Sequence, residues 1–200
     1  NLSLNILANA NHIQYFLYLC SMNIFYLDNN PQKCAEYHCD KHVVKMILES
    51  AQLLCTTHWE TGGEAPYKKT HVNHPSSRWT RESLSNYKWL CELGMELCKE
   101  YTYRYGKIHK TQQHLEWLSD NLPNIEDKGF TEMPQAMPDE CKMEDSIEGY
   151  RNYYIKEKQI SNQVEGGELI ANANQELFEI AEVAKSKSTP QKGLDRFEQG

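Results

Sequence analysis

The segment 32–58 carries apolar residues at the spacing of an α-helix. They follow one another at i, i+4, i+8 and i+11: Val43, Ile47, Ala51 and Leu54. This spacing places all of them on one side of a helix, and such a face is buried against other elements. The sequence therefore predicts a helix from Gln32 to His58 that packs at the centre of a helical domain.

The same helix carries a second stripe, made of polar side chains. Its members step by four, three, four and three positions along one side of the helix: His38, His42, Lys45, Glu49 and Gln52. Asp40 and Lys41 flank this stripe. Two interpretations stay open. The stripe is either a functional site or a solvent-exposed face on which Lys45 pairs with Glu49 one turn later.

Turn residues and apolar spacing divide the rest of the chain into further elements. We predict helices over Ser76–Arg104, Lys107–Leu118 and Asp145–Lys158, a short strand over Asn23–Leu27 and an extended segment over Thr131–Asp139. Pro134 and Pro138 exclude a regular helix from that last segment. The expected fold is mainly α: a single-domain helical bundle with a short N-terminal strand and an extended, proline-containing strap.

The composition changes at both ends of the chain. Residues 1–21 contain no charged side chain, so we expect a non-native or disordered leader before Met22. Residues 161–200 include a run with helical apolar spacing, which predicts an amphipathic helical tail. The helical catalytic or binding domain is therefore expected to span residues 22–160.

Cysteine usage and net charge limit the compartment and the partners. The seven cysteines are an odd number without a CxxC pair, which favours reduced thiols and a cytoplasmic location, in the host cell if the protein is viral. With a formal net charge of −7, the protein would have to bind nucleic acid through a local patch. We also expect a monomer with no cofactor and no membrane partner.

The polar residues of two regions suggest three kinds of chemistry. Lys45, with Asp40 or Glu49 to move a proton, suits covalent catalysis by an amine. A second set, at the start of the next long helix, suits an anion: His71, His74, Arg78 and Arg81. The alternative for this set is a capping turn at His74. In a third interpretation four imidazoles share a metal ion: His38, His42, His71 and His74.

Several motifs between Met22 and Lys158 resemble one known family. They are MNIFYLD, CAEYHCDKHVVKMILESAQLL, YKKTHVNHPSSRWTRESLSNYKWL, EYTYRYGKIHK, TEMPQAMPDE and YRNYYIKEK. Small phage and environmental proteins with these motifs are labelled pyrimidine dimer DNA glycosylases, and they are distantly similar to the endonuclease V type glycosylases and AP lyases. The resemblance implies a mainly helical, single-domain protein.

The resemblance also implies a reaction. In that class an N-terminal α-amine attacks the sugar C1′ to give an imine, a glutamate of the first helix assists, and β-elimination then cuts the strand without a metal ion. By position, the glutamate of that class corresponds to Asp40 in this chain, and Glu49 is the second candidate for the carboxylate. The basic residues that hold the bent DNA would correspond to Lys41, His42 and Lys45.

The chain departs from that pattern at the amine. Asn23 follows Met22, the chain continues upstream, and removal of a methionine before asparagine is poor. The nucleophile would then be a lysine such as Lys45. We therefore predict a DNA-repair glycosylase with AP-lyase activity that acts on damaged pyrimidines in double-stranded DNA. Two alternatives stay open: a metal-dependent enzyme that acts on nucleotides through the histidines, and a non-catalytic viral module that binds nucleic acid or protein.

Overall fold

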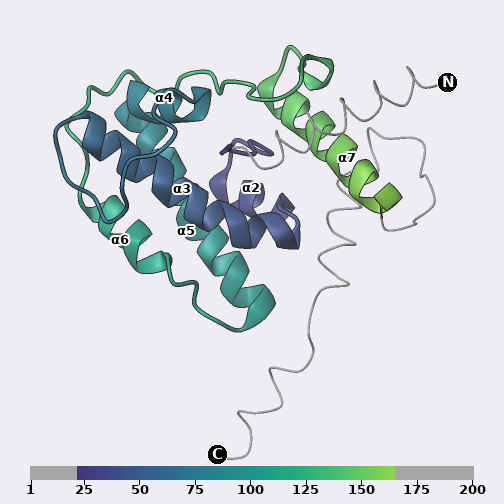
Figure 1. Cartoon of the computed structure of the whole chain (residues 1–200), viewed down its shortest axis with the longest axis horizontal. Coiled ribbons are helices and arrows are strands. Elements are labelled where there is room, and N and C mark those ends of the chain that lie inside the picture. Colours follow the sequence, from purple (N-terminus) through teal and green to yellow (C-terminus); the bar gives the residue numbers. More distant parts are fainter. Residues whose placement is uncertain (1–21, 165–200) are drawn as a thin grey trace, which may run out of the picture.

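The computed structural model describes residues 22–164, and its regular elements there are helices (Figure 1). They are α2 (Pro31–Tyr37), α3 (Asp40–Glu60), α4 (Pro75–Glu82), α5 (Leu84–Tyr105), α6 (Gln112–Asp120), the 3₁₀ helix η1 (Asp139–Cys141) and α7 (Ser146–Val164). The prediction of a mainly α, single-domain protein is confirmed. The predicted leader (1–21) and most of the predicted tail (161–200) lie outside the described residues.

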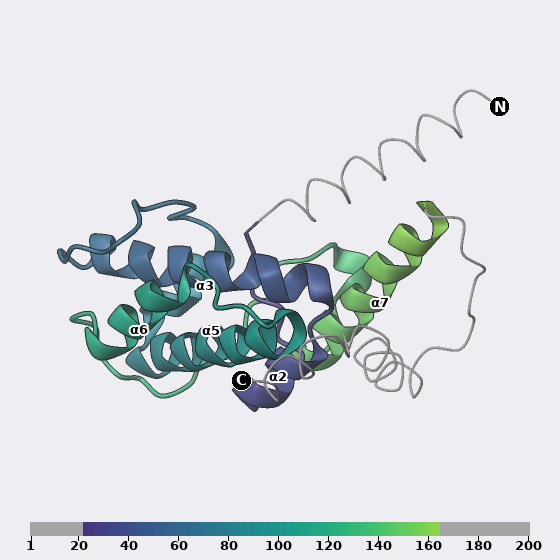
Figure 2. The same ribbon diagram turned by 90° about the horizontal axis from the view of Figure 1, so that it is seen from below.

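The core lies between α3 and α5, which run antiparallel beside each other (Figure 1, Figure 2). The apolar face predicted for α3 has no exposed surface: Val43, Ile47, Ala51 and Leu54. Helix α6 approaches α5 at Gly94, where an added Cβ would lie 2.8 Å from Leu115 Cδ2. A larger residue at Gly94 would therefore push the two helices apart.

The central helix of the prediction is broken in two. His38 and Cys39 have extended backbone, with ψ of 134° and 160°, and they separate α2 from α3. Arg104 of α5 donates to the carbonyl oxygens of His38 at 2.7 Å and of Glu36 at 3.1 Å. The N–H of Cys39 donates to the Tyr154 hydroxyl at 2.7 Å. The single-helix prediction is wrong because these distant side chains satisfy the backbone groups that a continuous helix would pair internally.

The second long helix is also broken, at Ser83, whose φ of −146° and ψ of 144° are extended. Asp127 caps α5 from outside the helix, because its Oδ1 accepts from the Ser85 N–H at 3.2 Å and from the Ser85 hydroxyl at 2.6 Å. Hydrogen bonds from Ser85, Gly129 and Ser83 hold the pKa of the Asp127 carboxyl below its ordinary value. The prediction of one helix over Ser76–Arg104 is wrong because the residue that caps α5, Asp127, comes 42 residues after Ser85 and is not part of the local sequence.

Residues 22–28 have no regular secondary structure and form no β-ladder with any other described segment. Their backbone groups bind side chains instead. The N–H of Leu27 points to Cys34 Sγ at 3.4 Å, and Arg151 Nε donates to the Leu27 carbonyl at 2.9 Å. The predicted strand over Asn23–Leu27 is therefore wrong, because helices rather than a second strand surround this segment.

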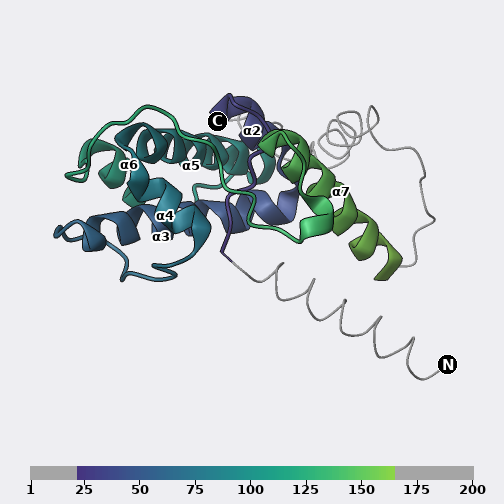
Figure 3. The same cartoon turned by 90° about the horizontal axis from the view of Figure 1, so that it is seen from above.

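The predicted strap over Thr131–Asp139 is an irregular segment, and Figure 3 shows it running toward α7. Asn86 of α5 holds its beginning. The Asn86 amide donates to the Trp79 carbonyl at 2.9 Å and to the Thr131 hydroxyl at 2.7 Å, and it accepts from the Thr131 N–H at 2.9 Å. One buried side chain thus joins α4, α5 and the strap.

The ends of the later helices differ from the prediction by a few residues. Helix α5 ends at Tyr105 and is followed by Gly106, the predicted cap, which has the left-handed φ of 63° that glycine tolerates. Helix α6 begins at Gln112 rather than at Lys107, because residues 107–111 form a turn in which the Thr111 N–H donates to His109 Nδ1 at 3.2 Å.

Candidate functional site

Glu49 of α3 is a carboxylate with only 8% of its surface exposed. Its Oε2 accepts the backbone N–H of Asn23 at 3.2 Å, and its Oε1 forms an ion pair with Lys45 Nζ at 3.1 Å. Lys45 lies one helical turn before Glu49, whereas Asn23 comes 26 residues earlier in the chain. The fold therefore brings a backbone nitrogen, a carboxylate and an amine within hydrogen-bonding distance.

The strap and α7 fix the position of Asn23. Its Nδ2 donates to the Ala136 carbonyl at 3.0 Å, and its Oδ1 lies 3.1 Å from the hydroxyl of the fully buried Tyr150. That hydroxyl also lies 2.8 Å from the Pro134 carbonyl, so its single proton serves one of two acceptors. Because the side chain of Asn23 is held on both sides, its backbone nitrogen keeps its direction toward Glu49.

His42 is buried beside this group. Its ring stacks on Phe25 with 4.3 Å between the centroids and 13° between the planes. Its Nδ1 lies 3.0 Å from the Tyr154 hydroxyl. Phe25 comes two residues after Asn23, so the stacking anchors the same N-terminal segment. The prediction that His42 contacts DNA stays a prediction, since in this structure the ring packs in the interior.

His38 is also buried, at the junction of α2 and α3. Its Nδ1 lies 2.7 Å from the Cys34 carbonyl and therefore donates to it, while Nε2 has no hydrogen-bond partner in the described part of the protein. Burial lowers the pKa of His38 to about 3, and the nearby charges of His42 and Arg104 act in the same direction. The folded protein therefore holds this imidazole neutral.

This neutral imidazole predicts a loss of stability in acid. The unfolded chain binds a proton at His38 below a pKa of about 6.5, but the folded chain does not until about 3. The free energy of unfolding should therefore fall as the pH drops from 6.5 to 3, by about 4 kcal/mol in total from this residue. Urea unfolding across this range should show a shallower pH slope for His38→Phe than for the unmodified protein. His114→Phe, the same substitution at a half-exposed histidine, is the matched control.

The other predicted residues of α3 lie at its first turn. Asp40 Oδ1 accepts from Arg104 Nη1 at 3.0 Å, and Arg104 also pairs with Glu100 at 2.9 Å. Lys41 is exposed. Asp40 precedes Glu49 by nine residues, about 13.5 Å along the helix axis. The structure thus separates the two predicted carboxylates, and Glu49 is the one that meets a nitrogen of the N-terminal segment.

The predicted anion-binding set lies before and along α4. His74 caps α4, because its Nδ1 accepts from the Ser76 N–H at 3.2 Å, and burial lowers its pKa. Arg81 donates to the Val72 carbonyl at 2.7 Å and so holds the loop. The exposed side chains of this set are His71, with φ of 49°, and Arg78. His74 therefore forms the capping turn that was the alternative interpretation. The role of the set in phosphate binding stays a prediction.

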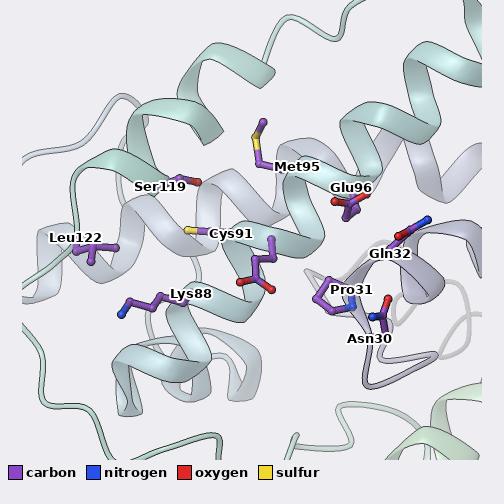
Figure 4. A pocket seen from close by; sticks show the side chains of 10 residues that line it. Asn30, Pro31, Gln32, Lys88, Cys91, Met95, Glu96, Ser119 and Leu122 are labelled. Atoms are coloured by element: carbon purple, nitrogen blue, oxygen red, sulfur yellow. The ribbon is translucent and has the colours of Figure 1, made fainter.

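The search for a metal site and for an open pocket leads away from these residues. Within residues 22–164, no three His, Cys, Asp or Glu side chains are arranged to hold a metal ion, which includes the four histidines of the third interpretation. An open pocket of about 510 Å³ lies between the start of α2, α5 and α6 (Figure 4). Its lining contains none of the predicted site residues: Asn30, Pro31, Gln32, Lys88, Cys91, Glu92, Met95, Glu96, Ser119 and Leu122.

Comparison with known proteins identifies the segment that carries Asn23, Lys45 and Glu49. Residues 22–115 match the family model described as pyrimidine dimer DNA glycosylase. The chain is similar to that family over this segment. The match begins at Met22, immediately before the nitrogen that meets Glu49, and it covers α2 to α5. No curated protein and no solved structure matches the chain.

The matched segment ends before the strap and α7, yet both contact its candidate site. Tyr150 and Ala136 hold Asn23, and Tyr154 holds His42. In the described residues, no helix is long and apolar enough to cross a membrane.

Two parts of the site were missed by sequence reasoning. One is the backbone nitrogen of Asn23, because the Met22-Asn23 sequence favoured Lys45 as the nucleophile and nothing in the local sequence placed this nitrogen beside Glu49. The other is Arg104, which was predicted only as the end of a helix. The polar stripe of α3 gave the one usable signal, since Lys45 and Glu49 stand one turn apart on it.

Proposed function

We propose that this protein is a DNA glycosylase with AP-lyase activity on damaged pyrimidines, and that Glu49 is its catalytic carboxylate. The observation that carries the proposal is the contact between the Asn23 nitrogen and Glu49 Oε2 at 3.2 Å, inside the segment that matches the pyrimidine dimer DNA glycosylase family. The substrate would be double-stranded DNA, bound by the protein as a monomer in the cytoplasm.

Each residue of this group has a role in imine chemistry. In a chain that begins at Asn23, its nitrogen is an α-amine that attacks C1′ of the deoxyribose and displaces the damaged base. Glu49 takes a proton from the attacking amine and later assists β-elimination, which breaks the C3′–O bond. Lys45 orients the carboxylate through the 3.1 Å ion pair. The exposed Lys41, one turn earlier, would bind a phosphate.

The nitrogens of Asn23 and Lys45 both lie within reach of Glu49, and an α-amine at Asn23 would be the better nucleophile at neutral pH. An α-amine has an ordinary pKa of about 7.7–8.0 and a lysine of about 10.4, so the α-amine is unprotonated far more often. In the chain that continues upstream, Asn23 N is a peptide nitrogen joined to the buried Met22. The catalytic form is therefore proposed to begin at Asn23.

Borohydride trapping on an abasic duplex tests this proposal. We expect a protein prepared with Asn23 as its first residue to form a covalent adduct, with the modified peptide carrying the mass at the Asn23 nitrogen. A protein in which Met22 and upstream residues are retained should trap at least about tenfold less, since only the α-amine reacts readily at neutral pH.

Three other outcomes are informative. Equal trapping by both forms that is lost in Lys45→Arg would move the nucleophile to Lys45. Binding of the duplex without any adduct in either form would reduce the protein to a binding module and overturn the proposed chemistry. Strand cleavage that a chelator abolishes would favour the metal-dependent alternative.

A further inference from the structure

The outward face of α3 is a narrow stripe that passes beside the candidate site. Between Lys41 and His58, the side chains that are not buried are Lys41, Val44, Lys45, Leu48 and Gln52. Because each residue turns the helix by about 100°, these five span only about 100° of its surface. Glu49 borders the stripe, since it follows Leu48 in the sequence and pairs with Lys45. Figure 2 shows α3 along one side of the domain, with α5 beneath it.

Two members of this stripe are apolar. Val44 is 40% exposed and Leu48 is 39% exposed, although the opposite face of the same helix is fully buried. The two side chains lie one helical turn apart and are therefore neighbours on the surface. Single exposed apolar residues are common, but apolar side chains that gather at a site indicate a surface for a ligand.

The charges of the stripe fit a polyanion. It carries two lysines and no carboxylate, although the whole chain has a formal net charge of −7. Glu49 at its border is almost buried and pairs with Lys45 at 3.1 Å, so it presents little negative charge to the outside. A DNA duplex on this face would place phosphates against the lysines and bases against the apolar pair.

The proposed reaction needs an opened base pair at the same place. An amine reaches C1′ of a deoxyribose only after the damaged pair has been opened, and opening it breaks stacking contacts with the neighbouring bases. An apolar side chain that enters the gap replaces part of those contacts and keeps the pair open. Leu48 has the required properties, because it is exposed, apolar and adjacent to Glu49 in the sequence.

We propose that Leu48 is a wedge residue that enters the base stack at the damaged pair, with Val44 packed against the neighbouring base. This inference rests on the proposed function. Leu48 is a positioning residue: it touches no reacting atom, and it acts by holding the strand so that C1′ faces the Asn23 nitrogen and Glu49. Its insertion is non-covalent, so binding and opening can be measured without catalysis.

Fluorescence of 2-aminopurine placed opposite a thymine dimer tests the wedge, because this base fluoresces more strongly when it is unstacked. The full chain is used, since its Asn23 nitrogen is a peptide nitrogen and the duplex is not consumed. At saturating protein we expect a rise of about threefold or more over the free duplex, and Leu48→Ala should reduce that rise at least about threefold. Leu48→Met, which restores the length and the apolar character, should retain most of it.

Leu122→Ala is the matched control, because Leu122 is also an exposed leucine but lines the pocket between α2, α5 and α6. It should leave the fluorescence rise unchanged. Leu48→Ala should keep the affinity of the unmodified protein for an intact duplex, which a loss of structure would lower. A preference for the damaged duplex with no rise, or with a rise that Leu48→Ala keeps, would overturn the wedge alone. Equal affinity of the unmodified protein for damaged and intact duplexes would overturn the proposed function and the wedge with it.

Discussion

Glu49→Gln is expected to lower the rate of imine formation on an abasic duplex by about 10²–10⁴-fold, the usual contribution of a general acid–base group. Glutamine keeps the shape of the side chain and an oxygen that accepts the Asn23 N–H, but it cannot take a proton from the attacking amine. Single-turnover borohydride trapping with the protein that begins at Asn23 measures this loss. Affinity for the duplex should change little, because Glu49 is almost buried.

Substitutions of two other carboxylates are the controls that distinguish the loss of Glu49 from a general effect of removing a negative charge. Asp40→Asn should retain most of the trapping rate if Glu49 is the catalytic group, since Asp40 binds Arg104 at the far end of α3. Glu92→Gln, an exposed position on α5, should be indistinguishable from the unmodified protein. A large loss in Asp40→Asn together with normal trapping by Glu49→Gln would instead assign the chemistry to Asp40.

Replacing Arg104 by methionine is expected to lower the free energy of unfolding by about 3 kcal/mol or more. Arg104 is 5% exposed, and its guanidinium binds two carboxylates and the carbonyl oxygens of Glu36 and His38. Asp40, whose side chain is 46% exposed, can regain water after the substitution, but the covered Glu100 carboxylate cannot do so fully. The loss of stability comes from the groups that Arg104 leaves unpaired and from the lost support of the extended junction between α2 and α3.

Urea denaturation compares this variant with Lys107→Met, just beyond the same end of α5. Lys107 is exposed and forms no ion pair within residues 22–164, so its substitution should change the free energy of unfolding by less than about 0.5 kcal/mol. Equal stability of the two variants would show that Arg104 does not support the junction of α2 and α3.

The helix breaks illustrate why local patterns were insufficient. The apolar spacing of α3 continues across the residues that separate α2 from α3, and nothing in the local sequence excludes a helix there. The extended backbone at His38 and Cys39 is stable because Arg104 and Tyr154 reach it from elements that are 66 and 115 residues away. The break at Ser83 likewise depends on Asp127. Such contacts depend on the assembled core, and the sequence of one segment does not reveal them.

The sequence alone determined the helical class and the buried face of α3, and it offered the pairing of Lys45 with Glu49 as one of two interpretations, because all three follow from the 3.6-residue repeat of a helix. Only the tertiary structure decided which carboxylate meets the N-terminal segment. That choice depends on Tyr150 and the strap, which hold Asn23 from positions more than a hundred residues later and direct its nitrogen to Glu49. The spacing of residues within a helix is fixed by backbone geometry, whereas contacts between distant segments exist only after the chain has packed.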